Sequence, residues 1–138
     1  MPMINVQVAS EPNAEVADKA QQTVTRLTAE ILGKDPKVTA VVVEFISPRF
    51  WFIAGKSAAV RGSAEFFVDV RISDGTNTKD EKARYVAETY AALSRLLGGR
   101  QSESYVHVND VRADAYGYGG LTQERRYIQG RAAPRFET

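Results

Sequence analysis

The sequence predicts an α+β fold in which two tandem β-α-β units form one four-stranded sheet with two helices on one face. Three observations predict it. Strand-like alternation, helix-like periodicity and a β-branched run follow one another in residues 2–46. The same order returns in residues 66–111. Each of these stretches is followed by a short segment rich in aromatic residues and glycine. Helical crossovers make the two strands within a unit parallel, with a right-handed connection.

The first unit is predicted to span residues 1–61. Residues 2–9 alternate between apolar and polar positions, which indicates a strand. Apolar residues recur every three or four positions in residues 13–32, which predicts an amphipathic helix, and Gly33 ends it. The almost uninterrupted apolar run 38–46 is typical of a buried central strand. The aromatic segment that follows it is expected to be a hairpin packed on a subunit or a ligand.

The second unit is predicted to span residues 62–125. Residues 66–72 alternate as a strand, and Thr78 with Glu81 has the form of a capping box. The apolar stripe after it predicts a helix over residues 79–97. Residues 105–111 are expected to form a second central strand, followed by another aromatic and glycine hairpin.

The two units repeat at a fixed spacing. The first strand of each unit matches best at a spacing of 64 residues, and the helix ends and hairpins match at 65 residues. The matches at 65 are Gly33 with Gly98, Trp51 with Tyr116, Ile53 with Tyr118, Gly55 with Gly120, and Ser57 with Thr122. Agreement without gaps at helix ends and hairpins indicates duplication. Residues 126–138 remain as a C-terminal tail, expected to contact a neighbouring subunit.

The composition limits the classes of binding partner that we expect for this chain. With 18 basic and 17 acidic residues the net charge is +1, which favours neither nucleic acid nor membrane. The absence of cysteine, of a secretory signal and of a membrane-length apolar run fits the cytoplasm. We expect no metal and no cofactor, because the chain has one histidine, no carboxylate cluster at ligand spacing and no phosphate-cradling glycine loop. The helix-free sheet face is expected to be apolar in the central strands and to need cover, which predicts a ring, most simply a homotrimer.

Pro2 is the candidate for chemistry. If Met1 is removed, the ring nitrogen of Pro2 becomes a free secondary amine at the start of a strand. An α-amino group has a pKa of about 8, and burial lowers an amine's pKa because the charged form loses hydration. The strand would therefore hold a partly neutral base in place. The alternative is an inert residue, since many proteins begin Met-Pro.

These features together resemble the tautomerase superfamily, which includes 4-oxalocrotonate tautomerase, malonate semialdehyde decarboxylase, the 3-chloroacrylic acid dehalogenases and macrophage migration inhibitory factor. The resemblance rests on Pro2 after Met1, the repeated strand-helix-strand unit and the hairpins 51–55 and 116–120, and it covers roughly residues 2–125. The length matches the double-length trimeric members. The resemblance implies that Pro2 is a general base that moves a proton between carbon and oxygen in a small enol or keto acid.

The resemblance also implies where the active site lies. The second unit starts at Phe66, an internal position without a free amine, so each subunit has one site. Tyr116 and Tyr118 are expected to wall the pocket, where a phenol can donate a hydrogen bond to an enolate oxygen. Packing between subunits is the alternative role for both tyrosines. Trp51 of the first hairpin is a further candidate for substrate contact.

The chain lacks the arginines that the resemblance leads one to expect. The positions that match them are Pro12, Thr39, Thr76 or Asn77, and Ser104. Other cations are therefore candidates for the substrate carboxylate: Arg71, which should lie beside Pro2, and Arg49 and Arg112, which flank the hairpins. His107 lies between Val106 and Val108, so it faces the other way together with Asn109. His107 is either an interface residue or a proton carrier.

Two alternatives remain open at this stage. The chain is a trimeric binding protein that kept the fold and lost the chemistry, as the missing arginines suggest. Alternatively, it is a dehalogenase, hydratase or decarboxylase on the same scaffold. That activity needs a water-activating acid, for which Glu44 and Asp35 are the candidates.

Overall fold

The computed structural model describes residues 2–99 and 103–136, and it leaves out the side chains of residues 131–136. The first half contains β1 (Met3–Ala9), α1 (Ala14–Leu32), the 3-10 helix η1 (Pro36–Val38), β2 (Ala40–Ile46), the 3-10 helix η2 (Pro48–Phe50), β3 (Phe52–Ile53), β4 (Lys56–Ser57) and α2 (Ala58–Arg61). The second half contains β5 (Phe66–Ser73), α3 (Lys79–Leu96), β6 (Tyr105–Val111), β7 (Gly117–Tyr118), β8 (Leu121–Thr122) and α4 (Gln123–Phe136).

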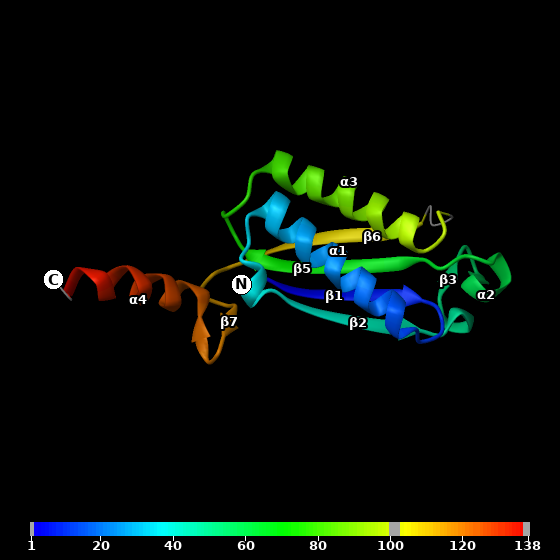
Figure 1. Cartoon of the computed structure of the whole chain (residues 1–138), viewed down its shortest axis with the longest axis horizontal. Coiled ribbons are helices and arrows are strands. Elements are labelled where there is room, and N and C mark those ends of the chain that lie inside the picture. The colour runs from blue at the N-terminus through cyan, green and yellow to red at the C-terminus, as the bar shows by residue number, and fades with distance from the viewer. Residues whose placement is uncertain (1, 100–102, 137–138) are drawn as a thin grey trace.

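The main sheet has four strands in the order β2-β1-β5-β6. β1 pairs with β2 in parallel, β5 pairs with β6 in parallel, and β1 pairs with β5 antiparallel in the middle. α1 and α3 lie side by side over one face of this sheet, as Figure 1 shows. The predicted architecture of two β-α-β units is therefore confirmed.

The prediction that residues 38–46 and 105–111 form central strands is wrong. β2 and β6 are the two edges, and β1 and β5 lie at the centre. Alternate residues of β2, such as Val41 and Val43, pack on the core beneath the helices, while Val42 faces away and is 42% exposed. The apolar run therefore covers two faces of an edge strand. Sequence cannot distinguish this from burial at the centre of a sheet.

The core fills the space between the helices and the sheet. Its buried side chains alternate along both central strands and recur along the helices, as the periodicity predicts. They include Ile4, Val6, Val8, Val24, Leu27, Ile31, Phe66, Val68, Val70, Ile72 and Leu93. The buried hydroxyl of Tyr85 on α3 lies 2.9 Å from Oγ1 of Thr28 on α1, so this hydrogen bond joins the two helices inside the core.

The helix ends follow the predicted signals. The Asn13 side chain accepts hydrogen bonds from the first turn of α1, and Gly33 ends α1 in the left-handed region. At α3, Thr78 and Glu81 form the predicted capping box. These local signals placed both helices correctly because each depends on groups a few residues apart.

The repeat is visible in individual hydrogen bonds. The amide of Ala58 donates to the carbonyl of Trp51 at 2.8 Å, and 65 residues later the amide of Gln123 donates to the carbonyl of Tyr116 at the same distance. Ser57 caps α2, and Thr122 likewise accepts from an amide in the first turn of α4. α2 and the start of α4 are thus the same element of the repeat.

α4 was not foreseen from the sequence, in which residues 126–138 were predicted only as a C-terminal tail that contacts a neighbouring subunit. Gly62 ends α2 after one turn in the left-handed region, whereas Tyr127 occupies the corresponding place in α4 and the helix continues. α4 extends away from the rest of the molecule in Figure 1. Tyr127 and Ile128 on it are 64% and 54% exposed.

Candidate active site

The start of β1 lies at the same end of the sheet as the ends of β5 and β6. This follows from the antiparallel pairing of β1 with β5 and the parallel pairing of β5 with β6. Pro2 stands directly before β1 and is buried. Its carbonyl accepts a hydrogen bond of 3.2 Å from the amide of Ala40, so the parallel strand β2 holds the chain at this point. Strand pairing therefore fixes the position of the Pro2 nitrogen in the fold.

Arg71 lies next to this end of β1, as predicted. Its partner across the antiparallel pair is Met3, the residue after Pro2. Side chains of directly opposite residues project on the same face about 5 Å apart. The Arg71 side chain is 56% exposed, and its Nη2 lies 3.8 Å from Oδ2 of Asp69. This loose ion pair leaves donors of the guanidinium free for a carboxylate.

Tyr116 reaches the same place from the hairpin after β6. Its hydroxyl lies 3.5 Å from the carbonyl oxygen of Arg71. Burial raises the pKa of the Tyr116 phenol, although a hydrogen bond from the backbone of Met3 and the charge of Arg71 act in the opposite direction. The phenol is therefore a proton-bearing donor near the chain's first strand. The structure places one of the two predicted tyrosines beside this end.

Tyr118 and Arg112 are the other two candidates at this end, and each contacts a different residue of the same chain. The guanidinium of Arg126 lies over the Tyr118 ring at 4.5 Å, and Tyr118 is 48% exposed. Arg112 donates two hydrogen bonds of 3.0 and 2.9 Å to Asp114. These bonds raise the pKa of Arg112 and lower that of Asp114. Tyr118 and Arg112 thus have local partners within the chain.

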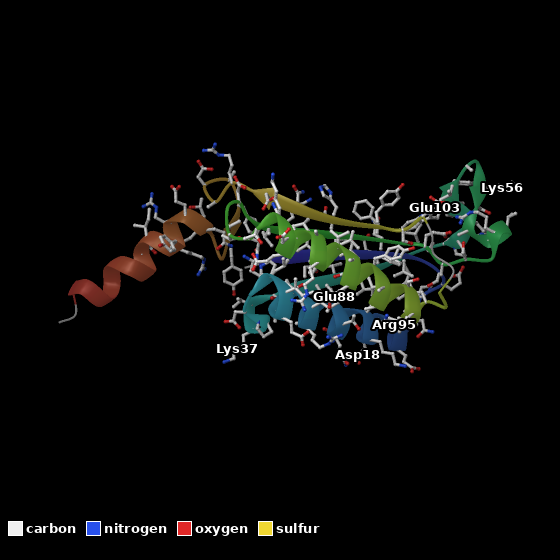
Figure 2. All side chains as sticks on the ribbon, turned by 90° about the horizontal axis from the view of Figure 1, so that it is seen from above. Asp18, Lys37, Lys56, Glu88, Arg95 and Glu103 are labelled. Atoms are coloured by element: carbon white, nitrogen blue, oxygen red, sulfur yellow. The ribbon has the colours of Figure 1, made fainter. Side chains whose placement is uncertain are left out.

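Arg49 and Trp51 lie at the opposite end of the sheet. Both follow β2, whose end is beside the end of β1 rather than its start. Figure 2 shows this separation, because Lys37, just before β2, and Lys56, in the first hairpin, are at opposite ends of the sheet. Within one chain these two candidates therefore lie away from Pro2, because each hairpin follows a different edge strand.

The helix-free face of the sheet is not apolar, contrary to the prediction. The middle of this face carries polar side chains from all four strands. They are Glu44 of β2, Asn5 of β1, Asp69 and Arg71 of β5, and His107 and Asn109 of β6. The Asn5 amide donates to Oε1 of Glu44 at 2.7 Å. His107 is opposite Asp69, and Asn109 is opposite Arg71. His107 and Asn109 therefore face away from Val106 and Val108, as predicted.

A small hollow opens on this face beside the start of β1. Its volume is about 140 Å³, and Met3, Asn5, Asp69 and Arg71 line it. Oδ1 of Asp69 is buried and has no hydrogen-bond partner within the described part of the chain. Sequence reasoning missed Asp69 and Asn5. The alternation of residues 66–72 does place Asp69 on the same face as Arg71, which was the available signal.

Lys34 was also missed. It follows the end of α1, and its Nζ donates a 2.8 Å hydrogen bond to Oγ1 of Thr76 in the turn between β5 and α3. Desolvation by burial lowers the pKa of Lys34, while the charges of Glu81 and Asp110 act in the opposite direction. The amine therefore lies in the turn where the resemblance leads one to expect an arginine.

Next to this turn lies a larger cleft of about 560 Å³, between the end of β5 and the first turns of α4. It is lined by Ser73, Asp74, Thr76, Ala113, Gln123, Glu124, Arg126 and Tyr127.

Within residues 2–99 and 103–136, no group of three or more acidic or histidine side chains is arranged to hold a metal ion. Over the same residues, no helix is both long and apolar enough to cross a membrane.

Solved structures share this fold. A wild-type fused 4-OT that forms a symmetric trimer is 17% identical, with 88% of this chain and 96% of that chain covered and a TM-score of 0.77. Pt0534 inactivated by 2-oxo-3-pentynoate is 13% identical, with coverage of 90% and 98% and a TM-score of 0.78. A macrophage migration inhibitory factor-like protein from Entamoeba histolytica is 16% identical, with coverage of 88% and 97% and a TM-score of 0.71.

These likenesses define the class of fold. The chain has the fold of the fused 4-OT structures and of the macrophage migration inhibitory factor-like protein, and nearly the whole of each compared chain is covered. No family model and no curated protein matches the sequence. The shared architecture is therefore established by structure, and the residues around Pro2 must carry any statement about chemistry.

Proposed function

We propose that the chain is a proline-dependent tautomerase that acts on a small enol or keto acid. The observation that carries the proposal is the buried Pro2 at the start of a central strand, with Arg71 and Tyr116 beside it. Removal of Met1 makes the nitrogen of Pro2 a secondary amine. Burial then favours its neutral, basic form.

Each of the three residues has a separate role. In the enol-to-keto direction the Pro2 amine accepts the proton of the enol hydroxyl and returns a proton to the carbon that becomes tetrahedral. The reaction is an isomerisation, so no atom is gained or lost. Arg71 binds the substrate carboxylate, and the Tyr116 phenol donates a hydrogen bond to the oxygen while negative charge develops on it.

We further propose that the working form is a homotrimer, as in the fused 4-OT named above. Its support is a helix-free sheet face that exposes Val42 and Tyr105, two edge strands, and a C-terminal helix with exposed Tyr127 and Ile128. In a ring, Arg49 and Trp51 contribute to a Pro2 site only from a neighbouring subunit. The tail from residue 126 onward then contacts that neighbour.

Activity measurement tests the proposal directly. Intact mass should first show that Met1 is absent, because an amide at Pro2 cannot act as a base. Ketonisation of phenylenolpyruvate should then fall at least 100-fold in Pro2→Ala, in line with the usual contribution of a general base. Pro12→Ala, in an exposed turn, is the matched control and should keep full activity. Undiminished activity in Pro2→Ala would remove the proline mechanism.

A covalent probe adds an independent test. Pt0534 is inactivated by 2-oxo-3-pentynoate. In this chain a neutral Pro2 amine would add to the triple bond, forming an N–C bond while its proton passes to the neighbouring carbon. Peptide mapping should find the mass of one reagent molecule on the N-terminal peptide. Labelling confined to lysines would count against a free and basic Pro2.

A non-catalytic trimeric binding protein is the second candidate. The observation that favours it is the engagement of nearby cations, with Arg112 on Asp114 and Lys34 on Thr76. A retained Met1 together with ligand binding but no turnover would support it. Hydratase, dehalogenase or decarboxylase chemistry has weaker support, because Asp35 caps η1 and Glu44 is bound to Asn5. Turnover of 3-haloacrylates or malonate semialdehyde would revive it.

A further inference from the structure

We propose that Asp69 sets the charge of the substrate, so that the site takes monocarboxylates and rejects dicarboxylates. The inference rests on the proposed function of the Pro2 end, because it names the substrate class of that site. It also assigns a role to a carboxylate that neither the sequence pattern nor the fold accounts for.

The first step is the position of Asp69. It stands two residues before Arg71 on β5, and its partner across the pairing with β1 is Asn5. These residues and Met3 together line the 140 Å³ hollow beside the start of β1. A hollow of this size holds a small polar group of a ligand and little more. Its contents therefore lie close to the Asp69 carboxylate.

The second step is the balance of charge. Among the four residues that line the hollow, Arg71 is the cation and Asp69 is the anion, with 3.8 Å between Nη2 and Oδ2. Glu44 adds a second negative charge behind Asn5. One substrate carboxylate on Arg71 uses the available positive charge. A second carboxylate would face Asp69 without a counter-ion among the residues that line the hollow.

The third step is the unused acceptor. Oδ1 of Asp69 is buried and has no hydrogen-bond partner in the described part of the chain, which is a costly state for a charged oxygen. The Asp69 side chain as a whole is 23% exposed, so its carboxylate can accept a hydrogen bond from a ligand donor such as an enol hydroxyl, whereas it repels a ligand carboxylate. The exposed thioether of Met3 provides an apolar wall on the same side. A monocarboxylate with a hydroxyl or enol donor fits these requirements.

A pair of ligands that differ by one charge tests whether Asp69 makes the site prefer monocarboxylates. trans,trans-Muconate and its monomethyl ester have nearly the same shape, but only the first is a dianion. Calorimetric titration of the full chain without Met1 should show the monoester binding about tenfold more tightly, since tenfold corresponds to 1.4 kcal/mol. Asp69→Asn should reduce that preference at least fivefold, mainly by tightening muconate binding. Arg71→Ala should weaken both ligands.

Asp18→Asn, on the outer side of α1 away from the sheet (Figure 2), is the matched control and should keep the wild-type ratio. Asp69→Ser provides a second variant if the asparagine does not fold. An unchanged ratio in both Asp69 variants, wild-type preference for the dianion, or binding of neither ligand would overturn the proposal.

Measuring the turnover of a monoacid and a diacid distinguishes a failure of this inference from a failure of the proposed function. Phenylenolpyruvate carries one carboxylate and 2-hydroxymuconate carries two. Asp69→Asn should lower KM for the diacid with little change in kcat, whereas Pro2→Ala should lower turnover of both acids at least 100-fold. If neither acid is turned over while the binding ratios behave as stated, the tautomerase function fails and the role of Asp69 stands.

Discussion

At the scale of single residues, Glu65 shows how the two halves are held together. It is 1% exposed and lies just before Phe66, the residue that corresponds to Pro2 in the repeat. Arg61, at the end of α2, forms an ion pair with it, and Ser63 donates a second hydrogen bond. Nη2 of Arg61 and Oε2 of Glu65 are buried without a partner in the described residues. A buried pair of this kind is costly to break from one side.

Glu65 should make stability depend on pH. Burial by itself raises the pKa of Glu65, but hydrogen bonds from Arg61 and Ser63 outweigh it and lower the pKa. A lowered folded-state pKa contributes stability above the unfolded value of about 4.3, which is lost as pH falls through the folded value. Glu65→Gln should therefore unfold more easily at neutral pH, by about 2 kcal/mol, and lose less stability on acidification. Urea titrations from pH 7 to pH 3 measure both effects.

Glu30→Gln removes the exposed pair with Arg26 on α1 and serves as the control. It should leave the acid-dependent loss of the wild type in place. Parallel pH profiles for wild type and Glu65→Gln would show that the ion pair contributes nothing on acidification.

Ala54 occupies a position that suits glycine. Among residues 2–99 and 103–136, Ala54 is the only non-glycine residue whose φ is positive, and that angle is 54°. The repeat has Gly119 at the corresponding place, with φ of 60°. A Cβ in this conformation costs roughly 1–2 kcal/mol, partly offset by the greater entropy that glycine loses on folding.

Ala54→Gly should therefore stabilise the protein by about 0.5–1 kcal/mol, measured by chemical denaturation. Gly119→Ala is the reverse test and should destabilise it, since a Cβ there also lies 2.7 Å from Nη2 of Arg126. A loss of stability in Ala54→Gly would mean that the alanine side chain makes contacts that outweigh the strain.

At the scale of elements, the helices are specified mainly by their ends and by their apolar stripes. α1 begins at a capping asparagine and α3 at a reciprocal capping box. The hairpins and the short helices after them repeat because the same capping residues recur 65 positions later. A change at one helix end should therefore have a local and measurable effect.

Thr78→Ala should cost about 1 kcal/mol of stability, because the amide of Glu81 loses its side-chain acceptor at the start of α3. Thr23→Ala, within α1, is the matched control and should cost little, since alanine favours the helix interior. Thermal unfolding followed by circular dichroism compares the two variants. Equal effects would show that the capping bond is dispensable.

At the scale of the whole molecule, the layers leave one sheet face without helices. That face combines exposed Val42, Met3 and Tyr105 with a polar group of side chains around Asp69 and Arg71. Two edge strands bound it, and the hairpins lie beyond the ends of the sheet. An assembled ring would cover the apolar part and close the open side of the hollow near Pro2.

The assembly is testable by mass. Light scattering after size exclusion should give three times the chain mass of 15.2 kDa. Val42→Asp on the helix-free face should shift the protein toward smaller species, because a charge there would be buried between copies. Val86→Asp is the matched control, since Val86 is 38% exposed on α3. An unaltered mass in Val42→Asp would exclude this face from the interface.

Much of the fold could be predicted because its signals are local. The alternation of Ile4, Val6 and Val8 and the glycine after each helix depend on groups within one turn or one strand. The candidate site was predicted less well. Pro2, Arg71 and Tyr116 come together, but Arg49 and Trp51 do not, because a hairpin's place depends on which edge strand it follows.

The sequence by itself determined the two β-α-β units, their helix ends and the faces of their strands, because periodicity and capping act over a few residues. Only the tertiary structure decided that β2 and β6 are edges and that Asp69 shares a hollow with Arg71. The order of strands depends on pairing between β1 and β5, which are more than fifty residues apart. No pattern within either strand encodes the choice of that partner.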